Sequence, residues 1–360
     1  MYEWWNAHFH AAEPRPARID DDALDSMYLK RKRFLFEKFG VFGIGEENPV
    51  MDGRHVNTVI KYGMDLIPHI YGASLACQAP GGYMPKPFSK EELAGMAPAE
   101  INAHPIRDWT LGEKKKKEER YGSAFVFLDY ESPANIAVRL RGEDFYSDMI
   151  EDPGFARHVL SLCTETILSV LKFSDELTGA KPEGEGGLSL GNCNVVLMSP
   201  AMYAEIIKPF DVLLINEAMR RSGRKLNLNL HHCDVKADGF IGVYKDLPNL
   251  TSLQANHGTD IEAVRREMPG VSFLSMINPA EMASLGPAEM RSAIFRAVRL
   301  GSTELDLWNI DPAVHPARLY EILSDIRDAC AACGKKPVFE AMPFVWDELE
   351  WAYPMYQNRV

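Results

Sequence analysis

The sequence predicts an α/β protein built as one (β/α)₈ TIM barrel with an N-terminal extension. In its second half, short apolar runs near residues 188, 228, 252, 273 and 306 alternate with amphipathic stretches, the pattern of parallel βαβ units. The runs recur every ~20 to 40 residues, a spacing that suits a barrel. An open doubly wound sheet is the alternative, but neither nucleotide fingerprint, G-x-G-x-x-G or G-x-x-x-x-G-K-[ST], occurs here.

Start and stop signals justify the helices between these strands. Residues 153–178 carry apolar side chains at helical spacing and are followed by glycine. Ser199 and Pro200 begin another helix, which we expect to break before Pro209 and then resume. Further helices are predicted from 279, over 287–300 and over 316–333, and strands over 187–190, 225–230, 250–254, 271–276 and 305–308.

The first half of the chain is less regular. Residues 1–60 are polar, and we interpret them as an extension that packs on the barrel, which then covers 61–360. Residues 65–68 and 124–128 are candidate strands. The lysine-rich segment 113–120 is expected to be a solvated loop or helix.

Composition argues against several classes of function. The 360 residues carry 39 basic and 51 acidic side chains, so we expect no nucleic-acid or anionic-membrane partner. No run approaches the 18 apolar residues of a membrane span. The N-terminus also lacks the basic and apolar regions of a secretory signal. We therefore expect a cytoplasmic protein whose six cysteines are reduced.

The barrel prediction also indicates where the site lies. In (β/α)₈ enzymes the active site is built at the carboxyl ends of the strands, so polar residues that directly follow predicted strands become candidates. These residues are Asn192, Cys193, Asn194, His231, His232, Cys233, Asp234, Asn256, His257, Asp260, Asn278, Asn309 and Asp311.

His231 and Cys233 are the most informative pair. Residues two apart in an extended segment face the same side, so an imidazole and a thiolate can bind one Zn²⁺ ion. His232 faces the other side, where it would support the site. The candidates for a third ligand are Cys193, His257 and Asp234. A buried polar cluster that caps the strand is the alternative interpretation of the same residues.

Several motifs resemble the uroporphyrinogen decarboxylase superfamily. The run Met198-Ser199-Pro200 to Pro209, followed by a helix and then by His231-His232-Cys233, is similar to the family's ISP…HxC stretch. Weaker similarities lie at 142–145, 152–153, 271–279, 286–287 and 316–319. The resemblance covers about residues 130–330, and it implies a (β/α)₈ barrel.

The family has two functional branches. Its decarboxylases use no metal and grip porphyrinogen carboxylates with an arginine-rich N-terminal motif, which Arg15-Pro16-Ala17-Arg18 does not match. Its cobalamin-dependent methyltransferases hold zinc with H-x-C and a later cysteine, and His231 and Cys233 match the first two positions. Asn309 stands near the place of the later cysteine, and Asp234 replaces the glycine that follows H-x-C.

The resemblance therefore implies methyl transfer between a small methylated substrate, or a thiol, and a corrinoid protein, with Zn²⁺ activating the acceptor. Methylcobalamin would arrive on a separate partner protein, because no D-x-H-x-x-G signature occurs here. We assign metal binding to His231, Cys233 and Cys193, catalysis to Asp234 and His232, and substrate binding to Asn194, His257, Asn309 and Glu185. Glu185 is included because paired acids precede the family's ISP run.

Two other functions stay open at this point. The first is a metal-free lyase that decarboxylates a carboxylic acid, and the second is a catalytically silent barrel that binds a partner. A homodimer is compatible with all three hypotheses.

Overall fold

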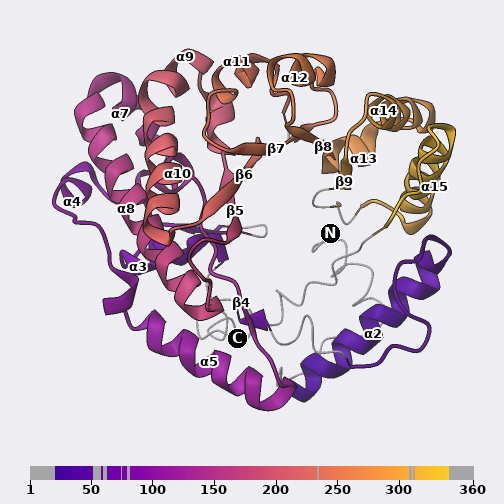
Figure 1. The fold of residues 1–360 in the computed structure, drawn as a ribbon, viewed down its shortest axis with the longest axis horizontal. Coiled ribbons are helices and arrows are strands. Elements are labelled where there is room, and N and C mark those ends of the chain that lie inside the picture. Colours follow the sequence, from indigo (N-terminus) through magenta and orange to yellow (C-terminus); the bar gives the residue numbers. More distant parts are fainter. Residues whose placement is uncertain are drawn as a thin grey trace. The chain divides into compact units, whose positions relative to one another are not determined.

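The fold is that of a computed structural model, in which the described residues are 21–51, 58–59, 63–73, 75–78, 82–232, 235–307, 310 and 313–339. Strands and helices alternate through the second half of the chain (Figure 1). Within the described ranges, no helix combines the length and the apolar composition that a membrane crossing requires.

The first half contains mostly helices. They are α2 (Asp21–Phe39), η1 (Gly40–Phe42), η2 (Gly63–Asp65), α3 (Leu66–Ile70), α4 (Lys90–Ala94), η3 (Ile101–Ala103), α5 (Ile106–Tyr121), α6 (Pro133–Arg141), α7 (Asp144–Glu151) and α8 (Pro153–Thr178). Short strands lie between them: β1 (Thr58–Val59), β2 (Leu75–Gln78), β3 (Gly82–Pro85) and β4 (Phe125–Val126).

The second half supplies the main sheet. Its strands are β5 (Glu185–Gly191), β6 (Lys225–His231), β7 (Leu250–Asn256), β8 (Ser272–Ile277) and β9 (Glu304–Leu307). The helices between and after them are η4 (Asn194–Leu197), α9 (Pro200–Met202), η5 (Tyr203–Ile207), α10 (Lys208–Ser222), η6 (Asp238–Phe240), α11 (Ile241–Tyr244), α12 (Ile261–Glu267), α13 (Pro279–Ser284), α14 (Pro287–Arg299) and α15 (Pro316–Ala332).

The main sheet follows chain order, β5-β6-β7-β8-β9, and the pairs β5/β6, β6/β7 and β8/β9 are parallel. These five strands fall where the sequence predicts them. Sequential parallel strands joined through helices are the arrangement of a (β/α)₈ barrel. The described residues supply five strands of such a sheet and do not close an eight-stranded barrel.

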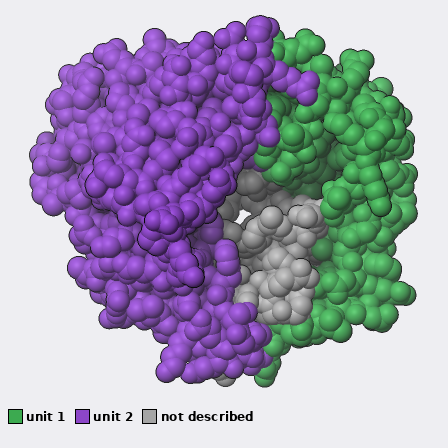
Figure 2. Space-filling model, in the orientation of Figure 1, with its two compact units in different colours: residues 1–58, 255–262, 273–360 green, residues 59–254, 263–272 purple. Residues whose placement is uncertain are grey.

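The chain divides into two compact units, which Figure 2 shows in separate colours. Unit 1 comprises residues 1–58, 255–262 and 273–360, and unit 2 comprises 59–254 and 263–272. The division between an extension over 1–60 and a barrel over 61–360 stays a prediction from the sequence.

In unit 2, β5 and β6 are covered by two long helices. Leu226, Leu228 and Leu230 alternate with more exposed residues along β6, because successive side chains of a strand point to opposite faces. Helix α8 packs against α10, and α10 packs against β6 (Figure 1). Helix α8 has the bounds that the sequence predicts, with Asp152 as its N-cap.

Helix α10 continues from a π-helical turn rather than from a break. Pro209 has no N–H group to donate to the preceding turn, so a regular α-helix through it would lose a hydrogen bond. The π-helix η5 lies directly before α10 and keeps the chain helical there. The expected interruption before Pro209 is therefore wrong.

In unit 1, one apolar core joins elements from both ends of the chain. Leu35 and Phe39 of α2 belong to the same buried cluster as Ile294 of α14 and Ile322 of α15. An early helix is thus part of the core that α14 and α15 form.

Two predictions for the first half change in the structure. Residues 66–70 form helix α3 where a strand or its end is expected, and only Phe125–Val126 of the candidate 124–128 forms a strand. Short apolar runs suit a buried strand and a buried helix equally, and their length does not decide between them. The lysine-rich segment lies within helix α5, one of its two expected forms.

Candidate functional site

In unit 2, the carboxyl ends of β5 and β6 lie beside Gln254 of β7 and bring several predicted residues together. The backbone N–H of Asn192 donates to the carbonyl oxygen of His231 over 2.8 Å. The N–H of His232 donates to the carbonyl oxygen of Gln254, also over 2.8 Å. The loop that carries Cys193 therefore starts beside the end of β6, at the sheet edge where parallel-sheet enzymes place their chemistry.

His231 is the best defined residue at this edge. Its Nδ1 lies 2.7 Å from Oε1 of Gln254, and both side chains are half-buried. An amide oxygen only accepts hydrogen bonds, so the neutral imidazole carries its proton on Nδ1. Nε2 then keeps its lone pair and is the nitrogen that can bind a metal or take up a proton.

Gln254 was not a candidate in the sequence. It becomes one only through the strand register, which pairs it with His231 across β6 and β7.

His232 is fully buried and belongs to an aromatic cluster. Its Nδ1 lies 2.7 Å from the hydroxyl oxygen of Tyr244. Its ring centroid is 4.9 Å from that of Phe240 and 5.5 Å from that of Tyr244. This side chain therefore packs in the core behind the end of β6, and its assignment to catalysis stays a prediction from the sequence.

The loop after β5 is held by hydrogen bonds to its backbone. The N–H of Asn194 donates to Oδ1 of Asn135 over 2.9 Å, and its carbonyl oxygen accepts from the hydroxyl of Tyr146 over 3.2 Å. The side chains of Cys193 and Asn194 are half-buried, so both reach solvent beside the end of the strand.

Glu185 is not brought to this edge. It is the first residue of β5, it is exposed, and its carboxylate lies 3.6 Å from Nζ of Lys225. Gly191 stands six positions further along the chain, which is ~20 Å along a strand. The structure therefore places Glu185 at the opposite end of β5.

His257 lies in unit 1 and faces a carboxylate. Its Nε2 is 3.1 Å from Oε1 of Glu281, and the same oxygen accepts from Nδ2 of Asn256 at 3.1 Å. The N–H of Asn278 donates to Oε2 of Glu281 over 3.0 Å. Burial raises the pKa of Glu281, but the hydrogen bonds from His257, Asn278 and Asn256 outweigh it and hold the pKa below the ordinary value. Asn278 and Glu281 form the capping box of α13, and this motif holds the Glu281 carboxylate against His257.

Three predicted site residues, Cys233, Asp234 and Asn309, lie outside the described residues. Among the residues that the structure does describe, no three His, Cys, Asp or Glu side chains stand close enough to hold one metal ion.

A charged cluster that the sequence analysis missed lies beside the end of β5. Nη1 of Arg139 is 2.7 Å from Oδ1 of Asp65, and its Nε is 3.2 Å from Oε2 of Glu131. Ser132, the next residue, donates its N–H to the carbonyl oxygen of Gly191 over 3.4 Å. We call Asp65, Asp129, Glu131 and Arg139 the arginine cluster.

The arginine cluster contains an acid that titrates near neutral pH. Burial, and secondly the charge of Glu131, raise the pKa of Asp129 to about 7, while Arg139 opposes the shift. Burial also raises the pKa of Glu131 and of Asp65, and Arg139 opposes both shifts. One guanidinium cannot neutralise three carboxylates, so repulsion among them favours a protonated carboxyl group, and the cluster can hold a proton at the edge of the sheet.

Asp129 follows the candidate strand 124–128 directly, so the strand-end rule could have found it.

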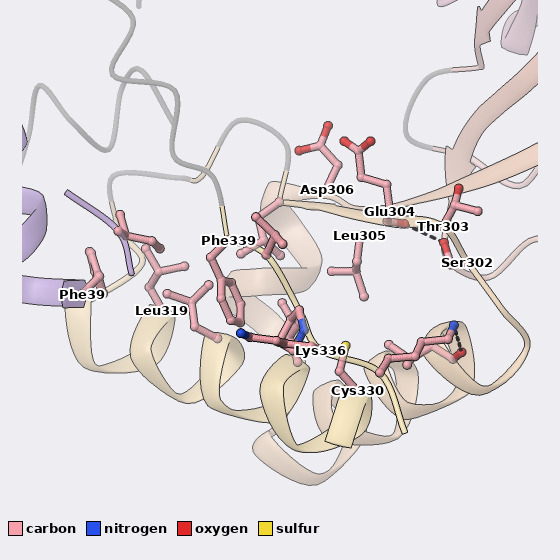
Figure 3. A pocket seen from close by; sticks show the side chains of 18 of the residues that line it. Phe39, Ser302, Thr303, Glu304, Leu305, Asp306, Leu319, Cys330, Lys336 and Phe339 are labelled. Carbon is pink, nitrogen blue, oxygen red and sulfur yellow. Dashed lines mark hydrogen bonds between the residues drawn. The ribbon is translucent and has the colours of Figure 1, made fainter. Parts of the chain in front are cut away.

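A cavity of about 820 Å³ lies elsewhere, within unit 1, between β9, α15 and α2. Leu305 points towards α15, whereas the carboxylates of Glu304 and Asp306 point away from it (Figure 3). Most of its walls belong to the apolar core of unit 1. Its lining offers few convergent polar groups, so the edge at β5 and β6 is the better candidate site.

Comparisons with known proteins bear on the fold alone. No family description and no curated protein sequence matches this chain. A methyltransferase from Methanosarcina mazei has a similar structure, with a TM-score of 0.59 and 14% identity over 89% of this chain and 90% of that one. A chain described as a vitamin-B12-independent methionine synthase from Listeria monocytogenes gives a TM-score of 0.45 and 12% identity over 92% and 94%.

The similarity to the Methanosarcina methyltransferase covers nearly the whole of both chains, so this protein has a methyltransferase-like α/β fold.

Proposed function

We propose that this protein is a methyltransferase of the corrinoid-dependent type, built on a complete (β/α)₈ barrel. It would move a methyl group between a small methylated substrate, or a thiol, and a separate corrinoid protein. The observation that carries the proposal is His231, whose ring is held at the carboxyl edge of the sheet by the hydrogen bond from Nδ1 to Oε1 of Gln254. The likeness of the fold to a methyltransferase agrees with this class of enzyme as an analogy of fold.

The donor set fits Zn²⁺. His231 and Cys233 would supply a nitrogen and a sulfur, Cys193 is the candidate for the third ligand, and a fourth position would stay open for substrate. When bound, the metal would lower the pKa of a thiol or hydroxyl acceptor. An outer partner such as Gln254 fixes the ring of a ligating histidine and raises its basicity.

The chain's own residues would prepare this site. Gln254 holds the ring of His231, and Tyr244 holds His232 behind it in the core. Asn194 stands beside the end of β5 on a loop whose backbone is fixed, so it can orient a substrate. Asp234 would take up the acceptor proton.

Metal content tests this proposal first. Protein purified without chelator is analysed for zinc, beside a variant that combines His231→Ala with Cys233→Ser. The matched control combines Cys333→Ser, an exposed thiol, with His315→Asn, which preserves an N-cap for α15. We expect about one zinc per chain in the wild type and in the control, and none in the site variant. Equal zinc in all three proteins would contradict the ligand assignment.

The reaction is tested separately with free methylcobalamin and small thiols such as dithiothreitol. Demethylation of the corrinoid is followed in the visible spectrum, and the methylated thiol by mass spectrometry. We expect turnover by the wild type and its loss in the site variant. If zinc binds but no thiol is methylated, the metal site stands and the acceptor assignment is wrong.

The arginine cluster favours a second candidate, a carboxy-lyase acting on a carboxylic acid. Decarboxylation needs a proton for the new carbanion, and the raised pKa of Asp129, about 7, suits a proton donor. Against this, Arg139 is occupied by Asp65 and Glu131 and does not offer a free clamp for a substrate carboxylate. Release of CO₂ from small and tetrapyrrole acids, lost in Asp129→Asn, would establish the lyase.

A further inference from the structure

A second buried carboxyl group stands directly behind the site and takes no part in the proposed chemistry. Asp211 of α10 is fully buried, as is Asn192 at the end of β5. Oδ2 of Asp211 accepts a hydrogen bond from the hydroxyl of Tyr203 over 2.8 Å and one from Nδ2 of Asn192 over 3.3 Å. The π-helix η5 is the element that presents Tyr203 to Asp211.

The remaining oxygens of the same two groups lack donors. Among the described residues, Oδ1 of Asp211 and Oδ1 of Asn192 are both buried and have no hydrogen-bond partner. Buried acceptors without a donor are rare in proteins and strongly unfavourable, and here two occur on side chains that already touch. An ionised Asp211 cannot satisfy either atom, because a carboxylate only accepts.

One proton on Asp211 removes both defects. A carboxylic acid and a carboxamide form a cyclic pair, in which the amide N–H donates to one carboxyl oxygen and the acid O–H donates to the amide oxygen. The first of these bonds is already present between Asn192 and Asp211. We propose that Asp211 is a neutral carboxylic acid in the folded protein and that its Oδ1–H group donates to Oδ1 of Asn192.

The groups that surround Asp211 favour this state. Tyr203 of η5 and Tyr244 of α11 face it, and burial raises the pKa of each tyrosine, so neither brings a charge. His232 also contacts Tyr244, through Nδ1 and the tyrosine hydroxyl. The described partners of Asp211 thus include no lysine or arginine that would stabilise a carboxylate.

The upward shift in the pKa of Asp211 agrees with a neutral acid. Burial raises the pKa of Asp211 to about 6, although the hydrogen bonds from Tyr203 and Asn192 lower it. A hydrogen bond that only the protonated form makes raises a pKa further. The acid is therefore expected to titrate above pH 6.

The buried proton fixes the position of a site loop. Asn192 is the first residue of the loop that carries Cys193 and Asn194, and its N–H is bonded to the carbonyl oxygen of His231. Asp211 acts through Asn192 and is therefore a positioning residue. This role for the loop depends on the proposed function, whereas the protonation of Asp211 does not.

The test follows the aspartate carboxyl carbons by ¹³C NMR in selectively labelled full-length protein without substrate. The signal absent from an Asp211→Asn variant identifies Asp211. We expect it at the neutral-acid shift at pH 6, with a titration midpoint above that pH. A carboxylate shift at pH 6 would overturn the proposal, whatever the enzyme does with methylcobalamin.

Exchange of the two side chains gives a second readout. Asn192→Asp alone puts two carboxyl groups together, and adding Asp211→Asn restores an acid–amide pair with its polarity reversed. We expect the double variant to recover most of the loss in melting temperature that Asn192→Asp causes. A double variant that melts no higher than Asn192→Asp would refute the pairing.

Discussion

Removal of Arg139 is the sharpest test of the arginine cluster. The side chains of Arg139, Asp65 and Glu131 are only 14, 17 and 11% exposed, so their charges are largely shielded from water. Arg139→Met keeps the length of the side chain but leaves its two partners facing each other without a cation. Breaking a buried ion pair on one side costs about 3–5 kcal/mol.

The size of this effect sets the expected melting shift. Unfolding entropy is about 2.1 cal/mol/K per residue, so a loss of about 4 kcal/mol in a cooperative chain of this length lowers the melting temperature by about 5 °C. The loss depends on pH with a definite sign. Without Arg139 the carboxyl pKa values rise further above their unfolded values, so the destabilisation is small near pH 4 and grows towards pH 7.

The assay is thermal unfolding by circular dichroism at pH 4.5, 6 and 7.5. Arg291→Met is the matched control, because Arg291 also contacts two carboxylates, Asp325 and Asp328, but is 47% exposed. Exposed pairs contribute about 0–1 kcal/mol, so this control should melt within about 1 °C of wild type. A shift for Arg139→Met that equals the control, or that does not change with pH, would refute the argument.

Three further predictions follow from single contacts. Gln254→Leu removes the acceptor for Nδ1 of His231 and should weaken zinc binding by about 10–100-fold in a chelator competition, while Gln254→Glu retains it. Asp211→Asn should become more stable relative to the wild type as pH rises. The folded pKa of Asp211, about 6, exceeds the ordinary 3.8, so its contribution to wild-type stability is fully present below pH 3.8 and about 3 kcal/mol of it is lost above pH 6. The measurement is melting temperature against pH for both proteins. Tyr244→Phe removes the hydroxyl bound to His232 in the core and should cost about 1–3 kcal/mol in denaturant unfolding.

The strands of the second half were predictable because their sequence carries the pattern of their environment. In β6, Leu226, Leu228 and Leu230 are buried and the residues between them are more exposed, and this alternation is visible in the sequence itself. The strand-end rule then led to His231 and the loop from Asn192, which the structure places side by side.

What the sequence could not supply is the register and the long-range pairing. Gln254 became part of the site only because β6 and β7 align it with His231, and a shift of one residue would turn it to the other face. Asp65 contacts Arg139, which is 74 positions away in the sequence. The short apolar run that follows Asp65 predicts a strand and a helix equally well. Local patterns carry no information about either contact.

The carboxyl groups with shifted pKa values fall into two groups, exposed and buried. Glu92, Asp152 and Glu217 have lowered pKa values because they accept hydrogen bonds at exposed positions in or beside helices, where ionisation favours the fold. Asp129 and Asp211 have raised pKa values because they are buried, and both belong to networks at the ends of β5 and β6. Burial of an ionised acid destabilises a fold, so two buried acids at one edge of the sheet favour that edge as the functional site.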